Sequence, residues 1–386
     1  MMSHLFPTYT RWEVEPAFAK GSILVGIDGK RYLDFTSGIG VCNLGHRPEL
    51  IQEAITNQLN KFWHVSNLFS QSEQERAAKL LADGANMDLV FFANSGAEAN
   101  EAAIKLARKT TGRSKIITFV NSFHGRTFAT MSATGQEKIK TGFGSMLETF
   151  VYLPFNDIAA LRNEMDSETA AIMLEVVQGE GGIHIGEHLF LNEVQQLCKE
   201  NGALFIIDEI QTGIGRTGMP FAFQHFGLSP DIITSAKGLG NGLPIGAVIG
   251  KKELRDVFSP GSHGSTFGGN PIAIAAAIAT METVFQQSFL DNVKEKSKYL
   301  FEKLEEKIAS SSHISTIRQL GMMIGLETTI DLPSLLKELR DNGLLVLPAG
   351  TNVVRLLPPL TVTTEEMDRA VNILQKIIEK HSKSAV

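Results

Sequence analysis

The sequence predicts an α/β protein whose centre is a mostly parallel β-sheet. From Leu89 onward, short apolar runs rich in β-branched and aromatic residues alternate with segments of helical periodicity. This alternation is expected for a parallel sheet covered by helices on both faces, because strands buried on both faces are apolar throughout. Two of the runs are closed by an ionisable residue, Asp208 and Lys237. Parallel sheets bind ligands beyond the carboxyl ends of their strands, so both side chains should lie in one crevice.

Length, charge and cysteine count narrow the class of protein. A chain of 386 residues is long enough for a large core and two domains. Its formal net charge of -6 offers no basic face to nucleic acid. Cys42 and Cys198 are too few and too far apart for a disulfide framework, and the histidines lack metal-ligand spacing. No apolar run approaches the roughly 20 residues of a membrane span. We therefore expect a cytoplasmic protein without metal, nucleic-acid or membrane partners.

The first elements along the chain are a hairpin and two helices. Two apolar runs, 22–27 and 31–35, flank Asp28-Gly29, which tolerates the positive φ of a tight hairpin turn. Helical periodicity then runs from Ile51 to Phe62. Ser72–Glu75 matches a capping box ahead of a second helix.

The first run of the sheet, Leu89–Ala93, leads into a candidate phosphate site. It is followed by Ser95, Gly96 and Ala97 and then by an alanine-rich helix. A helix that starts directly after a strand presents unpaired N–H groups and its dipole to an anion. The same residues are equally compatible with a serine that only caps a core helix.

The next strand ends offer aromatic and polar groups. After Lys115–Val120 come Phe123, which could stack on a heterocycle, and Arg126, which could bind a carboxylate. A core phenylalanine beside a solvated arginine is the plainer interpretation of that pair. The run Ala170–Leu174 ends in Glu175 and a polar, glycine-rich stretch.

Asp208 and Lys237 have surroundings that suggest different roles. Lys237 is the only charged residue between Thr234 and Gly250, and its neighbours are small. Loss of water disfavours the ammonium form and makes a lysine nucleophilic enough to form a Schiff base. A buried aspartate can stay ionised opposite a protonated ring nitrogen, which together with the lysine is the arrangement that pyridoxal phosphate requires. Taken singly, a surface lysine and a capping aspartate would be commoner.

The C-terminal third contains two further candidates. Thr266 lies in a loop rich in glycine and hydroxyl groups, where it could bind a phosphate or cap a turn. Arg355 lies among apolar residues and prolines, a setting in which an arginine needs an anionic partner.

A change of composition predicts the domain organisation. A helix to about Phe285 is followed by a Lys/Glu-rich amphipathic helix at 292–307, and 313–386 predicts strand, strand, helix, strand, strand, helix. We expect three parts, which are an N-terminal segment of the small domain, a large cofactor-binding domain and a C-terminal small domain: residues 1–50, 51–285 and 286–386.

Gly213–Gly218 matches GxGxxG and raises the alternative of an NAD-dependent dehydrogenase. Its context argues against a dinucleotide site, because Met219-Pro220 and an aromatic run follow instead of a helix. No Walker A, HExxH or GxSxG sequence is present.

Taken together, the strand ends form a set that resembles the class III pyridoxal-phosphate aminotransferases, the group acting on acetylornithine, ornithine and 4-aminobutyrate. The motifs that carry the resemblance are residues 94–102, 122–127, 178–182, 208–218 and 235–238. The resemblance covers nearly the whole chain. It implies a fold-type I homodimer with a seven-stranded central sheet, a small α+β domain built from both chain ends, and active sites at the dimer interface.

The resemblance also implies a role for each motif residue. Lys237 would be the Schiff-base lysine and proton shuttle, and Asp208 the partner of the pyridinium nitrogen. Gln211 would donate to the phenolic oxygen, and Phe123 would stack on the ring. The phosphate would be held by Ser95, Gly96, Ala97 and, from the partner subunit, Thr266. The substrate-binding residues would be Arg126, Glu180, Arg355 and Ser265, with Arg126 as carboxylate clamp and Glu180 masking Arg355 when a monocarboxylate donor binds.

The choice of donor rests on fewer residues. Ile39 occupies a place where ornithine enzymes have tyrosine, which disfavours a free α-ammonium, and Gln211 disfavours the aminomutase branch. We therefore expect transfer of the δ-amino group of N2-acetylornithine to 2-oxoglutarate, a step of arginine biosynthesis. The alternatives are another ω-amino donor (ornithine, 4-aminobutyrate, succinylornithine or succinyl-diaminopimelate) and a non-catalytic protein of the same fold.

Two departures from the family pattern are Val176 in place of proline and the shortened Gly45–Pro48, which is expected near the substrate mouth.

Overall fold

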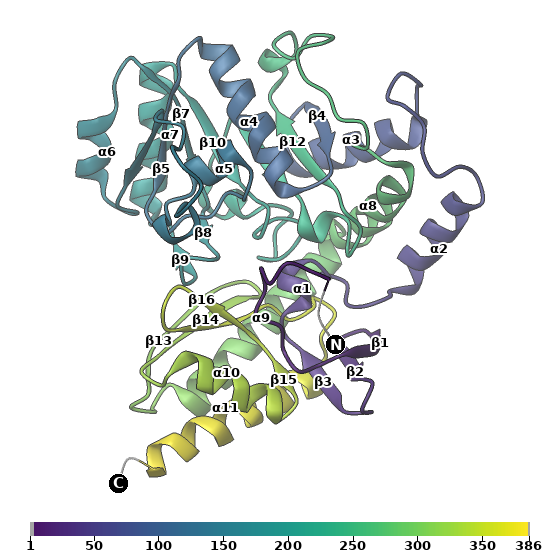
Figure 1. The fold of residues 1–386 in the computed structure, drawn as a ribbon, viewed down its shortest axis with the longest axis vertical. Helices are drawn as coiled ribbons and strands as arrows, with labels where there is room; N and C mark the ends of the chain where they lie inside the picture. Colours follow the sequence, from purple (N-terminus) through teal and green to yellow (C-terminus); the bar gives the residue numbers. More distant parts are fainter. Residues whose placement is uncertain (1–3, 385–386) are drawn as a thin grey trace.

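A seven-stranded sheet forms the centre of the computed structural model, which describes residues 4–384 (Figure 1). The strand order is β4-β12-β11-β10-β7-β5-β6, and only β12 runs antiparallel to its neighbours. The strands are β4 (Leu89–Ala93), β5 (Lys115–Phe119), β6 (Phe150–Leu153), β7 (Thr169–Leu174), β10 (Leu204–Asp208), β11 (Ile232–Ser235) and β12 (Gly246–Gly250). The predicted mostly parallel, seven-stranded sheet is confirmed.

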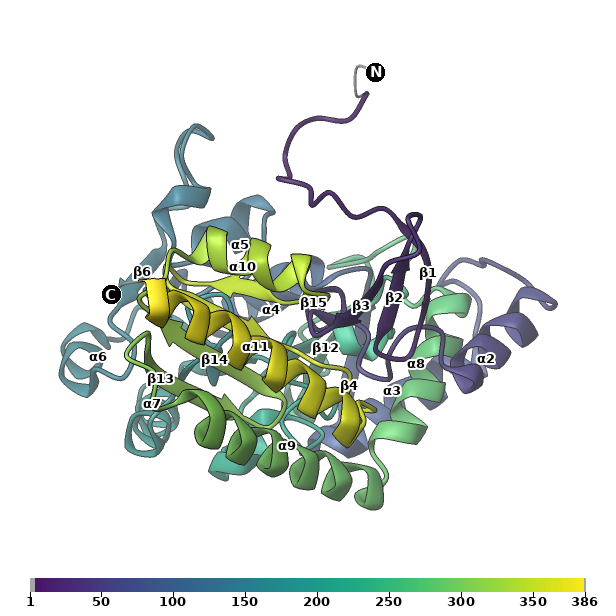
Figure 2. The same cartoon turned by 90° about the horizontal axis from the view of Figure 1, so that it is seen from below.

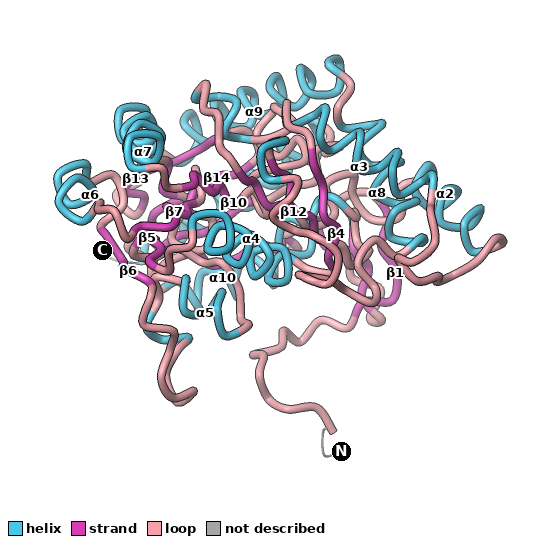
Figure 3. Tube along the Cα trace, turned by 90° about the horizontal axis from the view of Figure 1, so that it is seen from above, coloured by secondary structure: helices cyan, strands magenta, loops and turns pink. Residues whose placement is uncertain are grey.

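Helices cover both faces of this sheet, with α4 on one side and α7 and α8 on the other (Figure 3). Successive residues of β10 alternate between the two cores: Ile206 packs on the α4 side, and Phe205 and Ile207 pack on the opposite side. Side chains of a strand alternate in direction, so a strand buried on both faces must be apolar at every position. The helices of this region are α2 (Glu49–Leu59), α3 (Ser72–Ala85), α4 (Gly96–Thr111), α5 (Phe128–Ala133), α6 (Ile158–Glu164), α7 (His188–Asn201) and α8 (Pro271–Val284).

Both ends of the chain contribute to a second region, which lies below the large sheet in Figure 1. One sheet has the order β1-β2-β3-β15 and the other β13-β14-β17-β16. Their strands are β1 (Pro16–Lys20), β2 (Ile23–Gly26), β3 (Arg31–Asp34), β13 (Ile314–Leu320), β14 (Met323–Thr328), β15 (Leu344–Leu345), β16 (Leu347–Ala349) and β17 (Val353–Leu356). The helices are α1 (Ser37–Gly40), α9 (Gln287–Ile308), α10 (Leu332–Asp341) and α11 (Thr364–Ser384), and α9 and α11 lie across β13 and β14 (Figure 2). The domain boundaries at residues 50 and 285 stay a prediction.

Several elements differ from the sequence prediction. The hairpin is present as β2 and β3, but the edge strands β1 and β6 were not predicted, and most residues of β1 are exposed. The capping box is wrong: Ser72 is the first residue of α3, and its N-cap Gln71 makes no side-chain capping bond. Phe62 lies beyond the end of α2. The run Leu344–Ala349 divides into two strands, because its first half pairs with β3 and its second half with β17.

The Gly213–Gly218 segment joins the two regions of the chain. It is followed by a short 3-10 helix, Ala222–Phe226, and by no α-helix that could hold a pyrophosphate. Arg216 has no exposed surface, and its guanidinium donates to the carbonyls of Met322 (3.3 Å) and Pro358 and to Asn43 Oδ1 (2.7 Å). The segment therefore has a structural role. None of the helices among residues 4–384 is long and apolar enough to cross a membrane.

Replacing Arg216 with methionine should destabilise the protein by about 2–4 kcal/mol, because it leaves three buried oxygen atoms without their donor. Urea unfolding of variant and wild type measures the difference. The matched control is Arg162→Met, since Arg162 pairs with Glu193 at the surface. Equal unfolding midpoints for Arg216→Met and Arg162→Met would contradict the structural role.

Candidate active site

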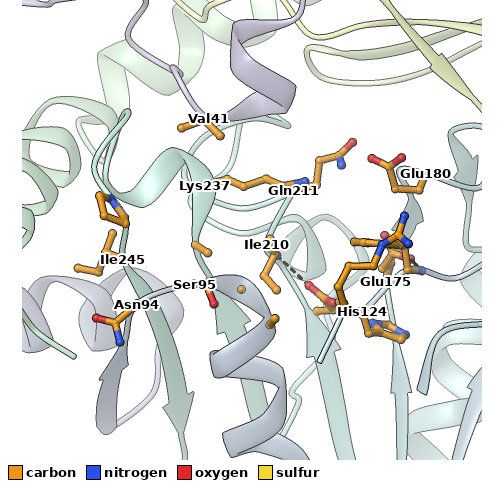
Figure 4. A pocket seen from close by; sticks show the side chains of 18 of the residues that line it. Val41, Asn94, Ser95, His124, Glu175, Glu180, Ile210, Gln211, Lys237 and Ile245 are labelled. Carbon is orange, nitrogen blue, oxygen red and sulfur yellow. Dashed lines mark hydrogen bonds and ion pairs between the residues drawn. The ribbon is translucent and has the colours of Figure 1, made fainter. Parts of the chain in front are cut away.

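A cavity of about 480 Å³ lies at the carboxyl edge of the large sheet (Figure 4). Nine of the twelve residues singled out from the sequence line it: Ser95, Gly96, Ala97, Phe123, Arg126, Glu180, Asp208, Gln211 and Lys237. The lining also includes residues that the sequence did not single out, among them Val41, His124, Glu175 and Ile210. Arg355 contacts the cavity wall through its hydrogen bonds, whereas Ser265 and Thr266 lie outside the lining formed by this chain.

The Asp208 carboxylate is held at the floor of the cavity by three donors. Its Oδ2 atom accepts from Asn100 Nδ2 and from His124 Nδ1, both at 2.8 Å, and its Oδ1 atom accepts from the Ile210 amide at 3.0 Å. Among the described residues, His124 Nε2 is buried without a hydrogen-bond partner. The three hydrogen bonds fix the Asp208 carboxylate where it could meet a protonated ring nitrogen.

Lys237 follows β11 with a left-handed backbone, φ 43°, and its side chain extends toward Gln211 (Figure 4). Within residues 4–384 its amine makes no hydrogen bond or ion pair. Loss of water lowers the pKa of Lys237, although the nearby Glu180 carboxylate opposes this effect. The geometry thus leaves an amine in the cavity that is easier to deprotonate than an exposed lysine.

The N-terminus of α4 forms one end of the cavity. Ser95 Oγ caps the helix by accepting from the Glu98 amide at 3.2 Å, so the capping interpretation is realised. The amides of Gly96 and Ala97 line the cavity, and in the described part of the chain they donate to no acceptor. A 16-residue helix with free amides at its start is a site for an anion.

The loop that carries Ser265 and Thr266 approaches this helix start from outside. Ser265 Oγ accepts from Asn94 Nδ2 at 3.0 Å and from the Gly268 amide at 2.9 Å. Thr266 is exposed. A role for Thr266 at the phosphate of a partner subunit therefore stays a prediction.

Arg355 and Glu180 form a buried ion pair at the opposite wall. Arg355, on β17, is 2% exposed. Its Nη1 donates to Glu180 Oε1 at 2.6 Å, to the Gly179 carbonyl at 3.0 Å and to Gln211 Oε1 at 3.0 Å. Its Nε has no hydrogen-bond partner among the described residues. Burial opposes ionisation of Glu180, but the charge and hydrogen bond of Arg355 outweigh it and lower the pKa of Glu180. The anionic partner expected for Arg355 is thus Glu180, which the short β8–β9 hairpin (Val177–Gln178 and His184–Ile185) presents.

Phe123 and Arg126 lie at the cavity wall and mouth. Phe123 is half-buried, and its ring lines the cavity instead of the core. The Arg126 guanidinium is exposed and lies 5.7 Å from the centre of the Phe123 ring. An exposed cation at the mouth can bind a substrate carboxylate without first losing a partner.

Ile39 and the Gly45–Pro48 segment, which were expected to bear on the choice of substrate, lie outside the cavity lining formed by this chain. Ile39 has φ 69° and is 45% exposed, and it is not part of that lining, whereas Val41 is. His46 lies away from the substrate mouth, where its Nε2 meets Asp34 Oδ2 at 2.8 Å beside a separate cavity. The hydrogen bond to Asp34 raises the pKa of His46 to about 10. Within one chain, the shortened Gly45–Pro48 segment therefore does not shape the site.

The fold and the cavity together define the class of pyridoxal-phosphate-dependent enzymes. The family model for class III aminotransferases matches residues 8–378. The acetylornithine aminotransferase of Bacillus subtilis (strain 168) is 58% identical over 382 residues, which cover 99% of each chain. The chain therefore belongs to the class III aminotransferases.

Solved structures agree with this assignment. The ornithine aminotransferase of Toxoplasma gondii, with partially occupied PLP at its active site, matches with a TM-score of 0.94 at 30% identity, over 99% of this chain and 93% of that one. The acetylornithine aminotransferase of Elizabethkingia anophelis matches with a TM-score of 0.87 at 32% identity, over 98% and 96%.

Two buried glutamates follow neighbouring strands of the sheet. Burial raises the pKa of both Glu175 and Glu209 from 4.5 to about 7. Glu175 lines the cavity, whereas Glu209 lies outside it and accepts from the Phe223 amide at 2.8 Å. Between about pH 4.5 and 7 the folded chain binds more protons at these groups than the unfolded chain does, so their contribution to stability falls as pH rises.

Replacing Glu209 with glutamine should remove one of these two pH-dependent contributions. The variant should gain stability relative to wild type as pH rises from 5 to 8, by at most about 3 kcal/mol. Urea unfolding of both proteins at the two pH values measures the gain. A stability difference that is the same at pH 5 and pH 8 would refute this titration.

Proposed function

We propose that this enzyme transfers the δ-amino group of N2-acetylornithine to 2-oxoglutarate, which yields N-acetylglutamate 5-semialdehyde and glutamate in arginine biosynthesis. The observation that carries the proposal is the Glu180–Arg355 pair in the wall of the cavity that holds Lys237 and Asp208. Relatives named acetylornithine aminotransferase, at 52% to 58% identity over nearly the whole chain, support the choice of donor.

The residues present fit pyridoxal phosphate. The free amides of Gly96 and Ala97 would hold its phosphate, and Asp208 would hold the proton on its ring nitrogen. The side chains of Phe123 and Ile210 would confine the ring, and Gln211 would offer its amide nitrogen to the phenolic oxygen. When bound, the cofactor supplies an electron sink for the amino carbon of the substrate.

Lys237 is the group that moves the proton in this proposal. Its amine has no hydrogen-bond partner among the described residues, and loss of water lowers its pKa. A larger share of neutral amine can then accept the proton from the donor carbon and return it at a neighbouring atom. The charges of Glu180 and Arg355 act on the pKa of Lys237 in opposite directions, since Glu180 raises it and Arg355 lowers it.

Two substrates of different charge have to use the same cavity. The donor carries one carboxylate, which Arg126 at the mouth would bind, while Glu180 keeps Arg355 neutralised. Glutamate carries a second carboxylate, which would displace Glu180 and use the free Nε donor of Arg355. Alternate masking and unmasking of one arginine would therefore serve both half-reactions.

We further propose a cytoplasmic homodimer whose partner supplies Thr266. Large apolar side chains are exposed near Thr266 and on the N-terminal segment, which extends away from the rest of the chain (Figure 2). They include Trp63 (65%), Leu68 (93%), Phe69 (66%) and Phe267 (58%), and Phe6 (89%) and Tyr9 (79%). An apolar surface of this kind favours a protein partner.

The proposed function is tested with a panel of donors and 2-oxoglutarate as acceptor. N2-acetylornithine should give the highest kcat/KM among N2-acetylornithine, N2-succinylornithine, ornithine, 4-aminobutyrate and N-succinyl-diaminopimelate. Lys237→Ala should lose activity with every donor, and borohydride should fix the cofactor to wild type but not to the variant. A wild type that takes up no pyridoxal phosphate, or that prefers another donor, would refute the proposal at the level of cofactor or substrate respectively.

Replacing Glu180 with alanine should shift the preference toward glutamate, because Arg355 loses the carboxylate that it binds in the folded chain. The ratio of kcat/KM for glutamate to that for N2-acetylornithine should rise about tenfold or more. The two half-reactions are followed separately by the absorbance of the bound cofactor. An unchanged ratio would count against the masking role of Glu180.

A further inference from the structure

One carboxyl group joins the two loops that form opposite walls of the cavity. Glu175 follows β7 directly and is 6% exposed. Its Oε2 accepts from the Phe123 amide at 3.0 Å, and its Oε1 accepts from the Gly179 amide at 3.3 Å. Phe123 belongs to the loop after β5, and Gly179 belongs to the β8–β9 hairpin. Glu175 is therefore a clamp between two loops, which are also linked by the hydrogen bond from Gln178 Nε2 to the Val120 carbonyl at 3.0 Å.

The Gly179 end of this clamp determines where Arg355 is held. The Gly179 carbonyl accepts from Arg355 Nη1 at 3.0 Å, and the next residue supplies the Glu180 carboxylate. Gly179 also packs against the Gln211 amide so closely that a Cβ atom would lie 2.4 Å from Gln211 Oε1. A shift of the Gly179 peptide must therefore move acceptors of Arg355.

The hydrogen bond from the Phe123 amide to Glu175 connects the clamp to the part of the cavity where the cofactor ring would lie. Phe123 lines the cavity, and the adjacent His124 donates to Asp208 at 2.8 Å. Glu175 thus lies between the network of Asp208 and the network of Arg355. Within the described residues it makes no ion pair with a cation, so charge neutralisation does not explain its burial.

Glu209, which follows a neighbouring strand of the same sheet, is a buried carboxyl group with a structural role and serves as a comparison for Glu175. It is fully buried after β10, and it accepts from the Phe223 amide at 2.8 Å and from the Thr212 hydroxyl. Neither Phe223 nor Thr212 lines the cavity. Glu175 differs in one respect, which is that both of its amide partners belong to loops of the site.

We propose that Glu175 is a positioning residue that sets the balance between the two half-reactions, by fixing the Gly179–Glu180 segment against Arg355 relative to the ring of Phe123. The inference rests on the proposed transamination. Without the clamp, the Gly179–Glu180 segment has more freedom and Glu180 masks Arg355 less completely. The enzyme then moves toward the dicarboxylate substrate, in the same direction as Glu180→Ala.

The test compares Glu175→Ala, Glu175→Gln and the control Glu209→Gln in cofactor-loaded enzyme. The readout is the ratio of kcat/KM for glutamate to that for N2-acetylornithine, with the absorbance of the bound cofactor as reporter. Glu175→Ala should raise the ratio roughly three- to tenfold, the range expected for the loss of the hydrogen bond at the Gly179 amide, which is the one of the two lost bonds that holds the Gly179–Glu180 segment. Glu175→Gln keeps one acceptor oxygen and should fall in between, while Glu209→Gln should leave the ratio unchanged.

A double-mutant cycle separates positioning from a general loss of stability. In the Glu180→Ala background, Glu175→Ala should no longer change the ratio, because its effect passes through Glu180. A ratio within twofold of wild type in Glu175→Ala and Glu175→Gln, an equal shift in Glu209→Gln, or additive effects with Glu180→Ala would each overturn the inference. A wild type inactive with both substrates would instead overturn the proposed function.

Discussion

The whole site depends on the buried carboxylate of Asp208 and on how it is held in place. The side chains of Asn100 and His124 and the backbone amide of Ile210 all form hydrogen bonds to it. Three hydrogen bonds to one buried carboxylate fix its orientation, so that it can face a protonated ring nitrogen in the cavity. The strand order contributes to the burial of Asp208, since β10 lies in the middle of the sheet, where helices cover it on both faces.

Much of the site could be predicted because strand ends converge. Asp208 and Lys237 follow adjacent parallel strands, so their proximity needed only the fold class. The partner of Arg355 was predictable in kind, because a buried guanidinium requires acceptors, and Glu180 was identifiable through the family motif. The anion site at Gly96 followed from a helix that starts immediately after a strand.

Other features depended on contacts that no local pattern specifies. The hydrogen bonds of His124 and Asn100 to Asp208 depend on how three elements far apart in the sequence pack together. Ile39 is turned out of the cavity by left-handed residues on a four-residue helix, which a sequence comparison at that position does not reveal. The structural role of Arg216 could not be predicted, because it lies within a segment that matches GxGxxG and its acceptors lie more than a hundred residues away in the sequence. The place of Thr266 depends on a second chain.

The pairing of β15 with β3 has a consequence for the order in which the protein is made. Leu344 and Leu345 complete a sheet whose other three strands end at Asp34. During synthesis the N-terminal hairpin must wait for some 300 further residues before its last strand leaves the ribosome. Meanwhile the large sheet between them can form from segments that are already out. A chain that stops before Leu344 would therefore carry an exposed, unpaired β3 edge.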